Sequence, residues 1–131
     1  MSDVTFLGLD EVLDIHEDQI ERYGGRAGIR DLALLESALA APAASFDGRF
    51  LHDTAFEMAA TYLVRVAQNR PFIDGNKRTA LMAVIVFLGL NGLSLKADPD
   101  SLTQLELDVA ERKISKAQVA VFFEKSTRPR D

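Results

Sequence analysis

The sequence predicts an all-α fold: a compact bundle of about six helices around a buried central helix. Three observations support this prediction. Apolar residues recur at intervals of three and four along much of the chain. Residues 80–90, ALMAVIVFLGL, contain no charged side chain and are too short to cross a bilayer, which is typical of a helix enclosed by others. Asp and Ser residues that can act as N-caps precede several of these segments.

The first expected helix covers residues 9–23, and acidic residues fill the positions between its apolar ones. Gly24 or Gly25 can end this helix, because glycine adopts left-handed backbone angles without a steric penalty. We interpret the cluster YGGRAG as a helix end and a turn. A nucleotide-binding loop would need a buried strand before it and Gly-Lys-Ser/Thr after it, and neither is present.

The second helix is expected to begin after an N-cap at Asp31 and to stop at Pro42, because proline interrupts a helix. Residues 42–53, PAASFDGRFLHD, are then predicted to form an irregular loop or a short hairpin. Residues 54–68 are expected to form a third helix with an apolar face. Small residues on that face allow a neighbouring helix to approach closely.

The apolar segment 80–90 is the expected central helix, and Asn91-Gly92 is predicted to end it through a left-handed conformation. Two further helices are expected, over about 99–112 and 115–125. Asp98 and Ser115 are their predicted N-caps.

Composition narrows the binding partners and the cellular location expected for the chain. Its 131 residues carry a net charge of −5, so the surface as a whole should not attract nucleic acid phosphates. The absence of cysteine fits a reducing compartment, and the N-terminal sequence lacks the pattern of a secretion signal. We therefore expect a cytoplasmic protein that binds neither nucleic acid directly nor membranes. Residues 1–131 are expected to form a single domain, with 126–131, STRPRD, as a frayed tail.

The strongest functional signal is the segment NRPFIDGNKRTA, which directly precedes the central helix. A helix N-terminus favours an anion, because its first N–H groups lack intrahelical partners and the helix dipole is positive there. Gly75 lets the backbone approach a phosphate, while Lys77 and Arg78 add positive charge. A carboxylate beside a polyphosphate, here Asp74, suits Mg²⁺.

A purely structural interpretation of this segment also has to be considered. Asp74-Gly75 is a common turn sequence, Asn76 can be an N-cap, and Lys and Arg are ordinary surface residues. The order of the residues favours the phosphate site instead. RPFIDGNKR matches the signature His-Pro-Phe-x-Asp/Glu-Gly-Asn-Gly/Lys-Arg at every position except the first, and it resembles the Fic/Doc superfamily.

Three other segments are similar to the death-on-curing (Doc) branch of that superfamily: EVLDIHEDQIERYGG, GIRDLALLESAL and RTALMAVIVFLGLNG. Together the resemblance covers most of residues 6–125. It implies a compact helical fold and the toxin of a toxin–antitoxin pair. Such a toxin transfers a phosphate from ATP to a threonine of elongation factor Tu and thereby blocks translation. A short antitoxin encoded beside it is the implied partner, and ATP and Mg²⁺ are the implied cofactors.

The resemblance also assigns roles to the motif residues. Arg70, Asp74 and Lys77 occupy the catalytic positions, and Asp74 is also the implied metal ligand. The implied phosphate-binding residues are Gly75, Asn76, Lys77 and Arg78. Residues 42–51 correspond to the family's flap, which positions the target segment by pairing with it.

Lys77 and Leu81 favour phosphate transfer over AMP transfer. Family members that transfer AMP usually have glycine at the first position and a second arginine at the other, whereas the Doc branch has lysine at the first. The resemblance implies that this lysine reverses the nucleotide, so that its γ-phosphate faces the acceptor hydroxyl. Two alternatives stay open: a Fic-type protein adenylyltransferase, and a non-catalytic nucleotide- or protein-binding module.

Arg70 stands where the family has the histidine that takes a proton from the attacking hydroxyl. Arginine is protonated at all ordinary pH values and cannot accept that proton. We therefore expect nucleotide binding with strongly impaired catalysis. Arg70 is either natural or an introduced inactivating change, and the intact remainder of the motif favours the second origin. The two histidines are not expected to replace the base: His16 is interpreted as a hydrogen-bonded core residue, and His52 as a surface residue.

Overall fold

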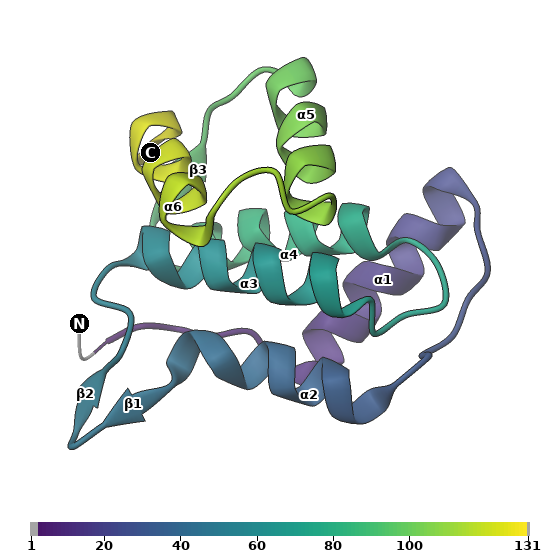
Figure 1. Ribbon diagram of the computed structural model, residues 1–131, viewed down its shortest axis with the longest axis horizontal. Helices are drawn as coiled ribbons and strands as arrows, with labels where there is room; N and C mark the ends of the chain where they lie inside the picture. Colours follow the sequence, from purple (N-terminus) through teal and green to yellow (C-terminus); the bar gives the residue numbers. More distant parts are fainter. Residues whose placement is uncertain (1–2, 131) are drawn as a thin grey trace.

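The computed structural model describes residues 3–130, which form a helical bundle with two small two-stranded sheets (Figure 1). Within these residues the helices are α1 Leu9–Tyr23, α2 Leu32–Ala40, α3 Ala55–Asn69, α4 Asn76–Leu90, α5 Pro99–Ala110 and α6 Lys116–Ser126. A 3₁₀ turn, η1 Ala41–Ala43, follows α2. The strands are β1 Ser45–Phe46, β2 Arg49–Phe50, β3 Leu93–Leu95 and β4 Thr127–Pro129. The all-α prediction is confirmed.

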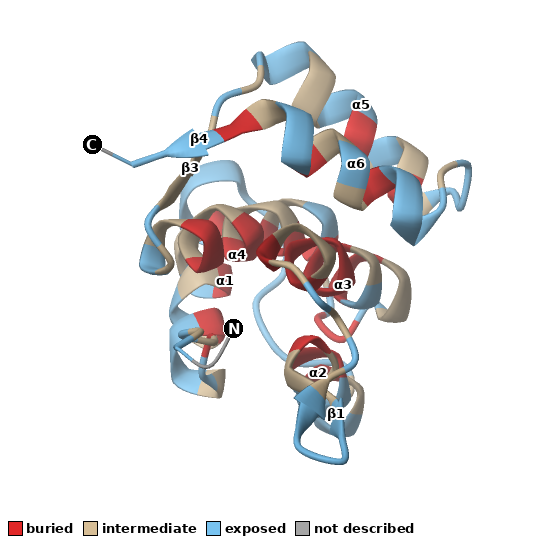
Figure 2. Cartoon of the chain, turned by 90° about the vertical axis from the view of Figure 1, so that its left-hand side faces the viewer, coloured by how far each residue is buried: buried red, intermediate tan, exposed pale blue. Residues whose placement is uncertain are grey.

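The helices pack in three layers around one core. Figure 1 shows α3 and α4 in the middle, with α5 and α6 above them, α2 below, and α1 running obliquely at the right. Figure 2 shows that the buried residues lie on the inner faces of these helices. The largest fully buried side chains of the middle layer are Tyr62, Leu63, Val66, Met58, Val84, Phe87 and Leu88. Within residues 3–130, no helix combines the length and the apolar character that a membrane span requires.

The predicted central helix, α4, is not the only central one, because α3 lies beside it in the middle of the bundle. Helix α4 is flanked by α1, α3 and α5, whereas α3 contacts α2, α4, α5 and α6. On its outer side, α4 keeps half-buried residues such as Met82, Ile85 and Val86. The small residues of α3, including Ala59 and Ala60, are fully buried, as close packing of helices requires.

The predicted N-caps are confirmed in detail. The side chains of Asp31, Asp98 and Ser115 each accept a hydrogen bond from a backbone N–H in the first turn of α2, α5 and α6. Helix α1 ends at Gly24, whose φ of 82° requires glycine. The loop-or-hairpin alternative for residues 42–53 resolves as the antiparallel β1–β2 hairpin.

Two local expectations were wrong, the start of α4 and the frayed tail. Helix α4 begins at Asn76, before the apolar segment. The apolar pattern missed this start because the first turn of the helix is polar and charged. The predicted end of α4 at Asn91-Gly92 is confirmed, and Gly92, with φ 78°, takes the left-handed conformation, whereas Asn91 has φ −108°. The expected frayed tail, 126–131, is ordered over its described part: Thr127–Pro129 pairs antiparallel with β3, and the N–H of Arg130 donates to the carbonyl of Gly92. Asp131 lies outside the described residues.

Candidate active site

The motif residues form a short loop between α3 and α4 that is bounded by two left-handed residues. Arg70 caps the C-terminus of α3 with φ 50° and ψ 57°, and Gly75 precedes α4 with φ 77°. Left-handed angles are uncommon for side chains other than Asn, Asp and His. The backbone at position 70 therefore accommodates arginine less readily than the histidine of the family motif.

Buried contacts hold the loop in this shape. The N–H of Phe72 donates to Asn76 Oδ1 (2.9 Å), and Asn76 Nδ2 donates back to the Phe72 carbonyl (3.0 Å). The His16 ring stacks on Phe72 with 3.8 Å between the ring centroids, and its Nε2 donates to the Asp74 carbonyl (2.8 Å). His16 is only 5% exposed, so its interpretation as a hydrogen-bonded core residue is confirmed.

A pocket of about 300 Å³ opens above the loop, and we call it the motif pocket. All six residues expected at the site lie in its wall: Arg70, Asp74, Gly75, Asn76, Lys77 and Arg78. The remaining lining residues come from the end of α3 and from the end of α5: Ala67, Gln68, Ala110 and Arg112. Within this lining the cations outnumber the single carboxylate, Asp74. Such a wall attracts anions.

The N-terminus of α4 supplies backbone donors to the same pocket. The first N–H that bonds within the helix is that of Thr79, which donates to the Gly75 carbonyl (3.0 Å). The N–H groups of Asn76, Lys77 and Arg78 therefore lack intrahelical partners. Gly75 has no side chain to cap them. A phosphate can satisfy these donors.

The polar side chains of the loop are not equally available. The side-chain oxygen and nitrogen of Asn76 both bond the backbone of Phe72, so this side chain holds the loop in shape. Only the backbone N–H of Asn76 is then available to an anion. Asp74 Oδ2 accepts the N–H of Arg26 (2.8 Å), which leaves Oδ1 as the oxygen offered to a cation. Residues 3–130 hold no cluster of three or more acidic or His side chains that could bind a metal. A Mg²⁺ ion at Asp74 therefore needs phosphate and water oxygens as well.

Arg78 is anchored through one hydrogen bond, and within residues 3–130 its buried Nε is unpaired. Its Nη2 donates to the Gly24 carbonyl (3.0 Å), and its guanidinium lies 5.4 Å from the centre of the Tyr23 ring. Its buried Nε has no hydrogen-bond partner among the described residues. Buried donors are almost always paired, so this N–H is an exception among the residues that line the motif pocket.

Sequence reasoning missed the contribution of α5. Arg112, just after this helix, lines the pocket, and its Nη1 donates to Gln68 Oε1 (2.8 Å). Burial raises the pKa of Glu106, and the charges of Lys77 and Arg78 oppose that rise. No pattern in the sequence connects α5 with the motif, because the contact depends on the packing of α5 against α3 and α4.

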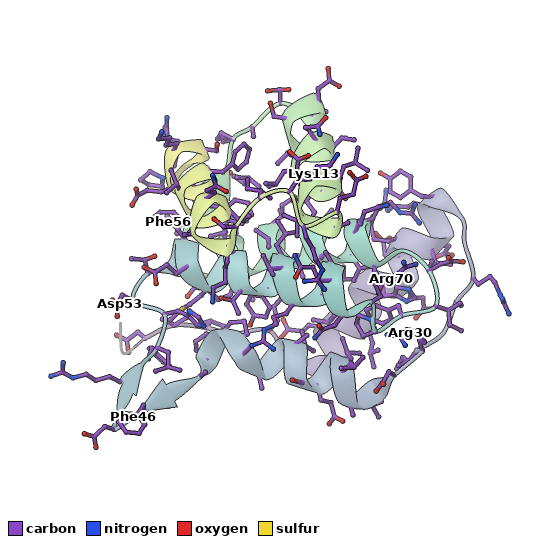
Figure 3. The ribbon with its side chains drawn as sticks, viewed as in Figure 1. Arg30, Phe46, Asp53, Phe56, Arg70 and Lys113 are labelled. Atoms are coloured by element: carbon purple, nitrogen blue, oxygen red, sulfur yellow. The ribbon has the colours of Figure 1, made fainter. Side chains whose placement is uncertain are left out.

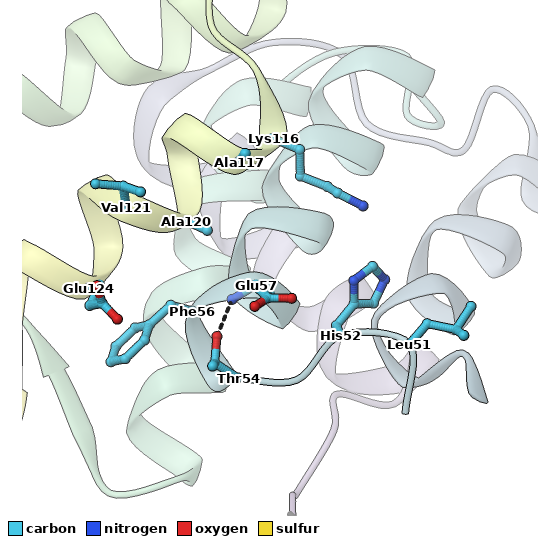
Figure 4. A pocket seen from close by; sticks show the side chains of 10 residues that line it. All are labelled: Leu51, His52, Thr54, Phe56, Glu57, Lys116, Ala117, Ala120, Val121 and Glu124. Carbon is cyan, nitrogen blue, oxygen red and sulfur yellow. Dashed lines mark hydrogen bonds between the residues drawn. The ribbon is translucent and has the colours of Figure 1, made fainter. Parts of the chain in front are cut away.

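A second cavity of about 450 Å³ lies between the end of the β1–β2 hairpin, the start of α3 and α6 (Figure 4). We call it the hairpin pocket. Its wall mixes apolar residues such as Leu51 and Val121 with the carboxylates of Glu57 and Glu124. His52, expected at the surface, is half-buried there, and burial, followed by the charge of Lys116, lowers its pKa.

Known proteins resemble the chain over most of its length. Residues 6–88 match the sequence profile of the Fic/DOC family. "Protein kinase doc" of Escherichia phage P1 is 36% identical over 111 residues, which cover 85% of this chain and 86% of that relative. "Toxin Doc" of Mycolicibacterium smegmatis is 41% identical over 78 residues, or 60% of each chain.

Proposed function

The chain belongs to the Fic/DOC family, and from this premise we propose that it is a Doc-type toxin whose motif pocket binds ATP for phosphoryl transfer to a protein hydroxyl. One observation carries the proposal: the pocket places Lys77, Arg78 and Asp74 around the uncapped N-terminus of α4. The name of the phage relative, a protein kinase, supports phosphate rather than AMP as the transferred group.

The site residues suit the charge of a nucleoside triphosphate. The N–H groups of the first turn of α4 can donate hydrogen bonds to phosphate oxygens, while Lys77 and Arg78 balance the negative charge. Asp74 Oδ1 is the proposed ligand for Mg²⁺, which when bound supplies further neutralisation of phosphate charge. Phosphoryl transfer depends chiefly on positioning and charge stabilisation, and this wall offers both.

The finer assignments rest on the family resemblance. We propose a threonine of elongation factor Tu as the acceptor, a block of translation as the result, and the cytoplasm as the place of action. A short antitoxin is the proposed partner, in keeping with the name of the Mycolicibacterium relative. The β1–β2 hairpin, which contains most of the segment expected to be the flap, is the proposed contact for the target segment.

Arg70 limits this activity in the chain as it stands. Its side chain lines the pocket at the position of the general base, but a guanidinium cannot accept the hydroxyl proton. We expect the rate of transfer to be lower than that of a histidine-containing site by at least ~10²-fold, the low end of a general base contribution. Nucleotide binding should persist, because the phosphate donors lie on α4.

The test is the Arg70→His variant, assayed with ATP, Mg²⁺ and elongation factor Tu and read out by product mass. We expect a gain of one phosphate and toxicity in cells that lack the antitoxin. Arg70→Gln is the matched control: it removes the same positive charge without adding a base, and it should not restore transfer. A gain of AMP would identify an adenylyltransferase instead. Equal rates for the Arg70 protein and its histidine variant would overturn the base assignment.

A further inference from the structure

The connection between α1 and α2, residues 24–31, runs alongside the motif loop and pairs with it. The N–H of Ile73 donates to the Gly28 carbonyl (3.0 Å), and the N–H groups of Arg30 and Asp31 both donate to the Pro71 carbonyl (2.7 and 3.0 Å). Ile29 and Phe72 form an antiparallel bridge at the same place. We call residues 24–31 the strap. Its pairing with the loop joins segments about forty positions apart.

The glycines of the strap allow this close approach. A Cβ at Gly28 would lie 3.1 Å from Ile73 Cδ1, and one at Gly25 would lie 3.2 Å from Asp74 Cβ. Both glycines also have positive φ, 117° and 112°. The interpretation of YGGRAG as a helix end is therefore correct but incomplete, because these glycines also seat the strap against the loop.

Arg30 makes the contact that bears most directly on the proposed active site. Its Nε donates to the Arg70 carbonyl (2.7 Å), and its Nη2 donates to the Asn69 carbonyl (2.8 Å). Figure 3 shows Arg30 and Arg70 together at the turn between α3 and α4. A cation on carbonyls at a helix C-terminus is favourable, since those carbonyls lack intrahelical partners and the helix dipole is negative there.

These two carbonyls bracket the backbone of residue 70. The Asn69 carbonyl belongs to the peptide plane before φ of residue 70, and the Arg70 carbonyl belongs to the plane after ψ. A rigid guanidinium that binds both oxygens fixes the relative orientation of the two planes. It thereby holds φ 50° and ψ 57°, a conformation that residues other than glycine rarely adopt.

We propose that Arg30 is the positioning residue for position 70: it holds that backbone left-handed and so directs the side chain at this position into the motif pocket. This inference rests on the proposed function, in which position 70 holds the general base in active relatives. Arg30 itself is exposed and does not line the pocket, so it acts through residue 70 and not on the nucleotide.

The kinetic test uses Arg70→His as the parent, with Arg30→Met as the test variant. We expect kcat to fall at least ~10-fold, since small misplacements of a reacting group cost about this much or more. The KM for ATP should stay within about twofold, because the phosphate donors lie on α4. Arg30→Lys, which keeps the charge but not the two-pronged donor, should give an intermediate kcat.

Arg26→Met is the matched control. Arg26 lies in the same strap, but its side chain makes no hydrogen bond or ion pair among the described residues, and only its backbone N–H contacts Asp74. It should leave kcat unchanged. Equal kcat values for Arg30→Met and Arg26→Met would overturn the positioning role. So would equal loss in kcat and in affinity for ATP, which would indicate general damage to the site.

A second measurement needs no catalysis and uses the Arg70 protein. We expect Arg30→Met to speed amide hydrogen exchange at Arg70, Phe72 and Ile73 at least ~10-fold, and to leave the β1–β2 hairpin unchanged. Unchanged exchange in the loop would overturn the inference. If Arg70→His transfers no phosphate at all, the proposed function fails, and the exchange result alone then decides whether Arg30 holds residue 70.

Discussion

The motif pocket and the hairpin pocket both lie beside helix N-termini, but the helices at the two pockets differ in how they are capped. In the hairpin pocket, Thr54 Oγ1 accepts the N–H of Glu57 at the start of α3, and Ser115 Oγ accepts the N–H of Gln118 at the start of α6 (both 3.1 Å). In the motif pocket, α4 begins at Gly75, which cannot cap it. The caps of α3 and α6 each satisfy one first-turn N–H, whereas no side chain caps α4, so all of its first-turn N–H groups are left for a ligand.

The charges of the two pockets also make the motif pocket the better site for an anion. The hairpin pocket is lined by two carboxylates, Glu57 and Glu124, and one lysine, Lys116. The motif pocket is lined by four cations and one carboxylate: Arg70, Lys77, Arg78, Arg112 and Asp74. The hairpin pocket is the larger of the two, about 450 Å³ against about 300 Å³. Volume alone therefore points to the wrong cavity for an anion, and the supply of unsatisfied donors and positive charge identifies the better one.

The strongest test of this comparison is to reverse the charge of one lysine in each pocket. Lys77→Glu should weaken ATP binding about thirtyfold, because replacing an attractive charge by a repulsive one costs on the order of 2 kcal/mol. Lys116→Glu, the matched change in the hairpin pocket, should leave the affinity within about twofold. Isothermal calorimetry measures both. Similar losses in the two variants would mean that net charge, and not the motif pocket, attracts the nucleotide.

A smaller effect, at least ~10-fold on Mg²⁺-dependent ATP affinity, is expected for Asp74→Ala, since the proposed metal ligand is lost. Asp74→Asn separates two roles of this side chain, because an amide oxygen still accepts the Arg26 N–H but is a much weaker Mg²⁺ ligand. We expect both variants to lose the magnesium dependence. An Asn variant with the parent's magnesium dependence would show that Asp74 only holds the strap to the loop.

The smallest effect concerns stability in the hairpin pocket. Burial holds the pKa of His52 below its ordinary value of 6.5, so folding favours the neutral ring. The stability that this preference contributes is present above pH ~6.5 and is lost as the pH falls through the folded pKa. In His52→Gln, the drop in Tm between pH 7 and pH 5.5 should therefore be smaller than in the parent. The same change in Tm with pH in both proteins would contradict a lowered pKa for His52.

Features encoded by neighbouring residues were predictable from the sequence. The caps at Asp31, Asp98 and Ser115 depend on side chains that bond within their own first turn. The six expected site residues are close together in the chain, so their convergence on one pocket follows from a single helix start.

Contacts between distant segments were not predictable in this way. Arg30 is one exposed arginine among several, and nothing local indicates that it binds carbonyls at positions 69 and 70. The pairing of β3 with β4 likewise depends on bringing α6 back across the bundle. Asn76 illustrates the limit within the motif itself: its residue type suggested phosphate binding or an N-cap, whereas its amide bonds the backbone of Phe72.

The contact between His16 and the motif loop is expected to form late in folding. The Asp74 carbonyl receives its hydrogen bond from a ring 58 positions earlier in the chain, and Phe72 packs against that same ring. Closing so long a loop has an entropic cost that must be met before the contact forms. Helices α3 and α4 can therefore pair with each other early, through local contacts, while the loop between them waits for α1 to dock. We expect the α3–α4 contacts to form before the motif loop takes its final shape.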